Sequence, residues 1–301
     1  NVTNVLYDAF LVDVAEEDRL DEVSATGYAW GYIGSLIPFF IGIIPYALVT
    51  FGILDSGLEH IAISFAFLVA VAWWFYYSLP LLRDVEQTYS IDRTEGEFRK
   101  SLKRLRKTFI DIRKYKMIFL FLIAYLLFID VVNTVIRLAT NIGGDLGVEA
   151  ATMLGVIVMV QVIAFPSALI YSKMVKRFGG KPMLYYGMLV YAVAVVIVFM
   201  ITKETTYLMW VVGAIVGTAQ GGIQSLSRSF FAKMVPVEKA NDFFGFYSVF
   251  GRFGGIISPF IIASFQVSLG INGAVLLLLI PLGIAAVLLA FVKEGRVKLV
   301  E

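Results

Sequence analysis

Ionisable and amide side chains fall inside long apolar stretches of this sequence, where their surroundings make them costly. On insertion scales a charged side chain at a bilayer centre costs about 2.5–3.5 kcal/mol, so each one needs a partner or a role. The candidates for contact with a solute or a proton are Asp130, Asn133, Arg252, Gln220, Gln224, Gln161 and Asp8. A carboxylate takes up a proton, a guanidinium holds a carboxylate with two hydrogen bonds, and an amide both donates and accepts. This set favours reversible binding over covalent chemistry.

Asp130 shares a helix face with other polar side chains. Asn133, Thr134 and Arg137 follow it at helical spacing. Counted from the start of its apolar stretch at about 1.5 Å per residue, Asp130 lies roughly 20 Å along, near the middle. Two interpretations stay open. Asp130 is either a protonatable or solute-contacting group, or one half of a structural salt bridge with Arg137 or Arg252.

Arg252 lies in a section of small residues that is suited to bending. Three glycines and a proline surround it, namely Gly251, Gly254, Gly255 and Pro259. Such a section can change direction during a conformational change, while Arg252 holds a carboxylate. The alternative is that Arg252 pairs permanently with Asp130 or Asp8.

The helix predicted at Tyr207–Phe231 has two distinct faces. Gln220, Gln224 and Arg228 repeat every four residues and share a polar face. Glycines at the same spacing form a second stripe, which lets another helix approach closely: Gly213, Gly217 and Gly221. These faces suit a helix that packs on protein on one side and lines a wet cavity on the other. For Gln161, Gln220 and Gln224, plain interhelical hydrogen bonding is an equally good explanation.

Composition indicates a membrane protein. Hydrophobic residues make up 59% of the chain and charged residues 16%, against about 45–50% and 25% in soluble domains. Mean hydropathy is +0.83. The absence of cysteine excludes disulfides and thiolate chemistry, and the single histidine, His60, cannot supply a zinc site. Neither a GxxxxGK[ST] nor an HExxH motif occurs, so the sequence predicts no cofactor, no metal and no enzymatic activity.

The fold class predicted is an all-α polytopic membrane protein with about nine helices. A span needs roughly 20 apolar residues. The predicted spans are Val2–Ala15 (the end of a longer helix), Tyr28–Val49, Ile61–Leu82, Met117–Ala139, Val148–Tyr171, Met183–Thr202, Tyr207–Phe231, Phe243–Val267 and Ile271–Val292. Because the first span is short, the chain is expected to be a fragment without its N-terminal part.

A long polar segment, 83–116, interrupts the spans. Its apolar residues recur every three or four positions among lysines and arginines, as in an amphipathic helix: Phe98, Leu102, Leu105, Phe109 and Ile112. Such a helix is expected to lie on anionic lipid. Its position between spans argues against nucleic acid as the partner. The segment separates an N-terminal remnant (1–82) from a C-terminal six-helix bundle (117–292) and a tail (293–301).

The positive charges predict the orientation. If the 83–116 segment is cytoplasmic, alternate loops and the tail share its side. All but three of the 25 lysines and arginines then lie on that side, the exceptions being Lys203, Arg137 and Arg252. Basic residues collect in cytoplasmic loops. The linker and the tail are therefore predicted to be cytoplasmic.

Three blocks of the sequence resemble the major facilitator superfamily. They are QGGIQSLSRSFFAKMVP with NDFFGFYSVFGRFGGIISPF (220–260), FLIAYLLFIDVVNTVIRLAT (121–140), and NVLYDAFLVDVA with RLDEVSATGYAWGYIGS near the start. They are similar to the branch related to the vacuolar amino-acid effluxers of autophagy. The resemblance implies the major facilitator fold of twelve helices, six on each side of a cytoplasmic loop. This chain would hold the equivalents of helices 4 to 12.

The resemblance further implies a secondary active transporter that moves a small solute by alternating access. Amino-acid efflux, protons as the coupling ion and a monomeric state are its finer implications. The membrane would be the plasma membrane of a prokaryote or the vacuolar membrane of a fungus. A non-transporting membrane sensor or a lipid-handling protein of the same fold stays open as the alternative. One departure is YSKMVKRFGGKPM, which has Ser172 and Lys176 where facilitators usually carry a glycine and an acidic residue.

Overall fold

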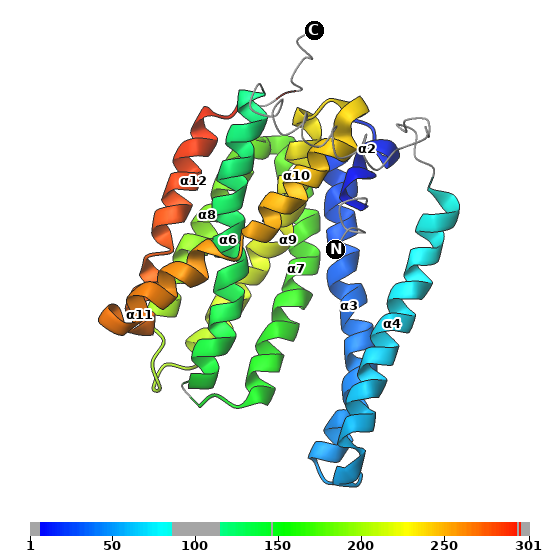
Figure 1. Cartoon of the computed structure of the whole chain (residues 1–301), viewed down its shortest axis with the longest axis vertical. Coiled ribbons are helices and arrows are strands. Elements are labelled where there is room, and N and C mark those ends of the chain that lie inside the picture. The colour runs from blue at the N-terminus through cyan, green and yellow to red at the C-terminus, as the bar shows by residue number, and fades with distance from the viewer. Residues whose placement is uncertain (1–6, 86–114, 146, 294, 296–301) are drawn as a thin grey trace, which may run out of the picture.

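The computed structural model describes residues 7–85, 115–145, 147–293 and 295, and the elements of this part of the chain are helical (Figure 1). They are α2 (Leu11–Val14), α3 (Leu20–Thr50), η1 (Ser56–Leu58), α4 (Glu59–Asp84), α6 (Lys116–Asp145), α7 (Ala150–Phe178), α8 (Gly180–Phe199), α9 (Leu208–Met234), η2 (Val237–Lys239), α10 (Ala240–Phe253), α11 (Ile257–Leu276) and α12 (Leu279–Phe291). Most of the predicted amphipathic linker, 86–114, lies outside the described residues.

Most of these helices are long and apolar enough to cross a membrane. Six stretches of described residues meet that condition: Leu20–Thr50, Ser56–Asp84, Lys116–Val135, Ala151–Phe178, Gly180–Phe199 and Ala240–Leu276. Helix α9 is not among them although it has 27 residues. Its length of about 40 Å suffices to span, but amides, glycines and Arg228 interrupt its apolar run. The prediction of an all-α membrane protein is confirmed.

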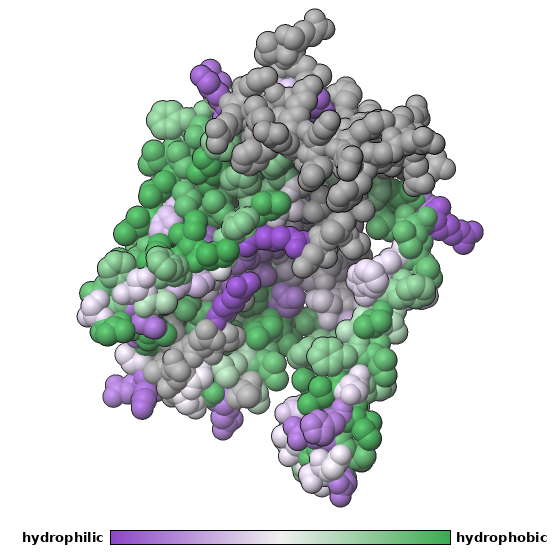
Figure 2. Space-filling view, viewed as in Figure 1, coloured by the Kyte–Doolittle hydropathy of each residue, from purple (hydrophilic) through white to green (hydrophobic). Residues whose placement is uncertain are grey.

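The connections alternate between two ends of the molecule (Figure 1). The turns after α3, α6 and α8 lie at one end, and those after α7 and α9 lie at the other, together with the residues that flank the linker. This second end is called the linker end below. Between the ends, Figure 2 shows mostly apolar side chains along the helices. The alternation agrees with the predicted order of spans, and which end faces the cytoplasm stays a prediction.

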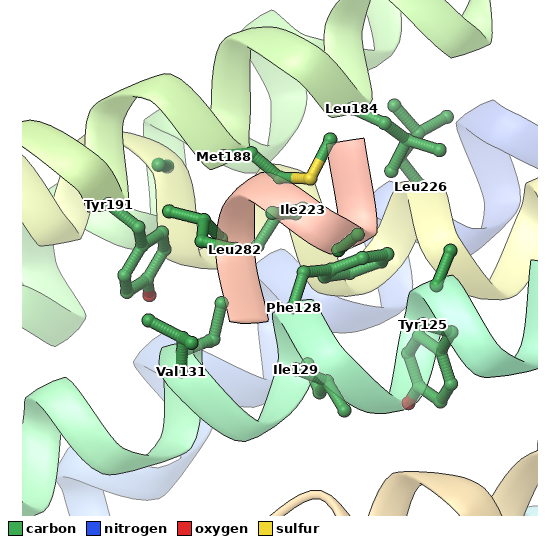
Figure 3. Packing of buried hydrophobic residues seen from close by; sticks show 14 of the residues in the cluster. Tyr125, Phe128, Ile129, Val131, Leu184, Met188, Tyr191, Ile223, Leu226 and Leu282 are labelled. Atoms are coloured by element: carbon green, nitrogen blue, oxygen red, sulfur yellow. The ribbon is translucent and has the colours of Figure 1, made fainter. Parts of the chain in front are cut away.

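Aromatic side chains fill the core near the linker end. Phe121 of α6 stacks on Phe230 of α9 with ring centroids 5.1 Å apart, and Tyr125 stacks on Tyr247 of α10 at 4.3 Å. Towards the middle, buried aliphatic side chains of α8, α9 and α12 meet α6 (Figure 3): Leu184, Met188, Ile223, Leu226 and Leu282. Helices α6–α12 thus form one packed body, in which α7 packs extensively on α9, and α3 lies against both α7 and α9.

One predicted span is two helices in the structure. The stretch Phe243–Val267 divides into α10 and α11, with Gly254–Ile256 between them. The glycines around Arg252 therefore mark a break that is already present, which corrects the expectation of a single straight span. A second change of direction lies at Gly270 within α11, where φ is +70°. Glycine adopts this angle freely, so the chain can turn at Gly270, between the last two predicted spans.

Candidate functional site

The glycine face of α9 packs closely on another helix, as its spacing predicted, and that helix is α7. A carbon added at Gly217 would lie 2.9 Å from Cβ of Ile163, and one at Gly221 would lie 2.8 Å from the Ala164 carbonyl oxygen. Gly213 continues the row and faces α7 in the same way. Real Cβ atoms essentially never come that close, so the glycines are what allows the two helices to approach at these points.

The polar face of α9 meets α3. The Tyr32 hydroxyl donates to Oε1 of Gln224 at 3.0 Å and also lies beside the Gln220 amide. From α7, the Gln161 amide donates to the Ser35 hydroxyl at 3.3 Å. These five side chains are called the amide cluster below. The cluster joins α3 to both α7 and α9, and its members are uncharged.

The amide cluster has unused hydrogen-bonding capacity. Oε1 of Gln220 is buried and has no partner among the described residues. Gln161 and Gln220 line a cavity of about 70 Å³ between α6, α7 and α9, whose other walls are apolar. Buried polar atoms are usually hydrogen-bonded, so an orphan amide oxygen beside a cavity calls for an explanation. A small polar ligand is one chemical solution.

Arg228 lies on the same polar face of α9 and is buried against α3 and the residues before it. Its guanidinium donates from Nη1 to Oδ1 of Asp8 at 3.2 Å, from Nε to the Ser24 hydroxyl at 3.0 Å, and from Nη2 to the Ser24 carbonyl at 3.2 Å. The ring centroids of Tyr7 and Tyr28 lie 5.3 and 4.9 Å from Cζ, within cation–π range. Only 3% of the Arg228 side chain is exposed.

Two further ion pairs connect α3 with α9 and α7 near the linker end. Lys233 of α9 pairs with Asp21, and Nζ of Lys176 on α7 lies 2.9 Å from Oε2 of Glu22. The three pairs are called the latch below: Asp8–Arg228, Asp21–Lys233 and Glu22–Lys176. Lys176, where facilitators usually have an acidic residue, therefore has an acidic partner on α3 in this chain.

Asp130 and Asn133 lie elsewhere, against the break between α10 and α11. Asp130 is fully buried, and its Oδ2 accepts the backbone N–H of Ser258 at 2.7 Å. Asn133 donates from Nδ2 to the Gly254 carbonyl at 3.0 Å. The expected Asp130–Arg252 pair is thus corrected, because the carboxylate contacts the start of α11 instead. Asp130 also belongs to neither the amide cluster nor its cavity.

The side chains of Arg252 and Arg137 are exposed, and neither lines the cavity beside the amide cluster. Arg252 lies in the last turn of α10, and Nη1 of Arg137 lies 3.7 Å from where a carbon on Gly255 would stand. Asp8, the other expected partner of Arg252, pairs with Arg228. The structure therefore separates the candidates into the amide cluster, the latch and the helix break.

Sequence reasoning missed the contribution of α3. Ser24, Tyr28 and Tyr32 follow one another at four-residue spacing on one face, matching Gln224 and Arg228 on α9. This spacing was an available signal. The predicted span begins at Tyr28, whereas α3 begins at Leu20, so the prediction leaves Ser24 outside the helix. The charge pattern assigns Arg228 to the cytoplasmic side, whereas the structure buries it between α9 and α3.

A larger groove of about 1260 Å³ separates α3 from α4. It is lined mainly by apolar and aromatic side chains such as Trp30, Phe39 and Trp73, and of the amide cluster it contains Ser35. Its walls suit apolar contacts. The polar chemistry that the sequence predicted is concentrated on the other side of α3.

Comparison with known proteins now places the chain. The model of the family described as "Vacuole effluxer Atg22 like" matches residues 11–298. The chain belongs to this family. The uncharacterised MFS-type transporter YxiO of Bacillus subtilis is 43% identical over 292 residues, which cover 97% of this chain and 68% of YxiO. Autophagy-related protein 22-1 of Aspergillus fumigatus is 24% identical over 283 residues, which cover 85% of this chain and 45% of that protein.

Solved structures show the same fold. The major facilitator transporter FucP, in its outward conformation, matches with a TM-score of 0.61 at 14% identity over 97% of this chain and 72% of FucP. A bacterial homologue of the iron transporter ferroportin, in its outward-facing state, matches with a TM-score of 0.56 at 13% identity over 93% of this chain and 65% of that one. The major facilitator fold is confirmed for this chain. The relatives named here are transporters of that superfamily or members of the Atg22 group, and none is described as an enzyme.

Proposed function

We propose that the chain is part of a secondary transporter that moves a small solute across a membrane by alternating access. The amide cluster carries the proposal, because it lies where α3 meets α7 and α9. The latch holds the same helices together near the linker end. Alternating access requires a site between two bodies that separate at one end at a time. Release of the latch would give the linker end access to the cluster.

The chemistry of the cluster supports a neutral or zwitterionic solute. Gln161, Gln220 and Gln224 supply amides, and Tyr32 and Ser35 supply hydroxyls, so the site donates and accepts without a net charge. Arg228, further along the same face of α9, adds a group that binds carboxylates. Amino acids combine a carboxylate with polar groups, and amino-acid efflux is therefore the specific function proposed. The description of the family as effluxers agrees with it.

The proposal also covers the orientation of the transporter in the membrane, the role of its linker and its coupling ion. Basic residues dominate the loops at the linker end, which supports a cytoplasmic position for that end. Segment 83–116 is proposed to bind anionic lipid and to separate two six-helix halves of a monomer. The membrane is the plasma membrane in a prokaryote and the vacuolar membrane in a fungus. Protons are the proposed coupling ion.

Efflux from proteoliposomes tests the function. The intact protein is reconstituted, the vesicles are loaded with radiolabelled neutral amino acids, and release is followed with and without a pH gradient. Gln224→Leu removes the amide that accepts from Tyr32 and is expected to slow release at least tenfold. Gln266→Leu changes an exposed glutamine of α11 and should leave the rate unchanged.

Equal release rates for Gln224→Leu and the parent protein would show that transport does not depend on the amide cluster. Failure of the reconstituted parent protein to release any neutral amino acid would contradict amino-acid efflux. If it also failed to exchange other small polar solutes, the non-transporting sensor would become the better interpretation.

A further inference from the structure

Two side chains of α6 hold the two sides of the break between α10 and α11. Asn133 donates to the carbonyl of Gly254, which follows the last residue of α10. Asp130 accepts the N–H of Ser258, in the first turn of α11. The end of a helix has unpaired carbonyls and the start has unpaired N–H groups. The amide donor of Asn133 therefore lies at the end of α10, and the anionic Asp130 lies at the start of α11, which is the favourable arrangement at each end.

The break lies unusually close to α6. A carbon added at Gly254 would lie 2.6 Å from Cγ2 of Ile129 and 3.2 Å from the backbone nitrogen of Asp130. One added at Gly251 would lie 2.9 Å from the Tyr125 hydroxyl. These glycines let the α10–α11 segment reach the polar face of α6. That face was recognised in the sequence, and the structure shows that it faces a helix break.

The Asp130 carboxylate uses only part of its capacity. Oδ1 of Asp130, Oγ1 of Thr134 and Oγ of Ser258 are all buried without a hydrogen-bond partner among the described residues. Thr134 is one helical turn from Asp130 on α6, and Ser258 is the residue whose N–H binds the carboxylate. Oδ1 is thus the carboxylate oxygen that can take up a proton while Oδ2 keeps the Ser258 N–H.

The electrostatic surroundings of Asp130 contain few titratable groups. Helices α11 and α12, which pack on α6, have none in their sequences. On α6 these groups are Lys116, Tyr125, Arg137 and Asp145, and on α10 they are Asp242, Tyr247 and Arg252. Lys116 and Asp145 are the two end residues of α6, and Asp242 is in the first turn of α10, away from the break. Tyr125 stacks on Tyr247, α8 brings Tyr191 to the core, and the cations of α9, Arg228 and Lys233, belong to the latch. Asp130 is therefore the acidic group at the break, and its oxygens face backbone and hydroxyls.

We propose that Asp130 is a proton-binding site that controls the break between α10 and α11. When ionised, the carboxylate accepts the Ser258 N–H and is stabilised by the positive end of α11, which keeps the break against α6. When Oδ1 takes up a proton, the helix end loses its anion and the segment is released. The proton moves to Oδ1 and no covalent bond other than O–H forms. This inference rests on the proposed transport function, to which it assigns the coupling ion and the element that responds to it.

Spin labelling tests the inference without a transport assay. The 301 residues contain no cysteine, so a single cysteine introduced at Ile256 in the break takes one nitroxide. A reference label replaces Leu189 on α8, which has similar exposure, 61% against 56%. Label mobility in the intact, reconstituted protein is recorded as the pH falls. We expect mobility at position 256 to rise on acidification and mobility at position 189 to stay constant.

Asp130→Asn keeps the shape and an acceptor but cannot bind the proton. In this background the label at position 256 should show the acid-state mobility at every pH, whereas Glu204→Gln, at an exposed loop carboxylate, should keep the parent titration. An Asp130→Asn variant that titrates like the parent would overturn the proposal. A parent whose label shows no pH response would overturn it too, even if the variant did not fold. A titration without any measurable transport would leave this inference standing and count against the proposed function.

Discussion

At the scale of single residues, Arg228 shows how a buried charge is made tolerable. Removing a guanidinium from water is expensive, and the cost is offset only when its donors are used and an anion is near. Arg228 directs three N–H groups at Asp8 and Ser24, while the Tyr7 and Tyr28 rings cover it. The planar fork of arginine suits this site, because it donates from three separate nitrogen atoms, whereas the three N–H groups of lysine share one nitrogen.

The first prediction concerns the stability that depends on Arg228. Arg228→Met leaves Asp8 without its cation and Ser24 without its donors, and should lower the free energy of unfolding by roughly 3 kcal/mol, the range measured for one-sided loss of a buried pair. Lys176→Met breaks an ion pair whose side chains are 57% and 42% exposed, and should have little effect. Thermal unfolding in detergent measures both. Similar losses of stability for the two variants would show that the contribution of an ion pair in the latch does not depend on its burial.

At the scale of elements, sequence spacing predicted helix faces but not their partners. The glycine and amide faces of α9 were readable because i, i+4 spacing is a local property. The start of α3 could not be predicted in this way, because Asp21 and Glu22 are residue types that are also common in loops. They lie in the first turn of α3, where carboxylates are favourable, and pair with Lys233 and Lys176, which are far away in the chain.

The same limit explains Asp130. The spacing predicts its polar helix face, and the sequence suggests Arg137 or Arg252 as a side-chain partner. The actual partner is a backbone N–H, that of Ser258, which every residue except proline has and which leaves no mark in a sequence. Only the position of the break in the fold makes that N–H available. The glycines near Arg252 indicated bending, but not that the break would lie against α6.

A prediction at this scale compares two glycines in helices. Gly221→Ala places a carbon 2.8 Å from the Ala164 carbonyl, so α7 must move and the melting temperature should fall. Gly245→Ala, in α10, meets nothing within 4 Å and should be neutral or raise stability by up to about 1 kcal/mol through helix propensity. Opposite signs in thermal unfolding are the expected result. A stabilising Gly221→Ala would mean that α7 and α9 do not pack as closely as described.

At the scale of the whole molecule, the latch holds α3 and Asp8, which precedes α2, against α7 and α9 at one end. All three pairs lie near the linker end. In the proposed alternating-access cycle, the site must be closed at one end while it is open at the other. With its three ion pairs formed, the latch is the element that would close the linker end to the proposed solute site.

The last prediction is that tying the latch shut stops transport. Cysteines at Glu22 and Lys176, whose charged atoms lie 2.9 Å apart, are joined by a short bifunctional thiol reagent in the intact protein. Because opening must separate α3 from α7, cross-linking should abolish efflux, and cleavage of the cross-link should restore it. The control joins cysteines at Lys181 and Lys293, because Lys181 already contacts the end of α12 and both positions lie in one packed body. Undiminished efflux through a fully cross-linked latch would show that this interface does not open. Equal inhibition by the control pair would show that the reagent acts on some other motion.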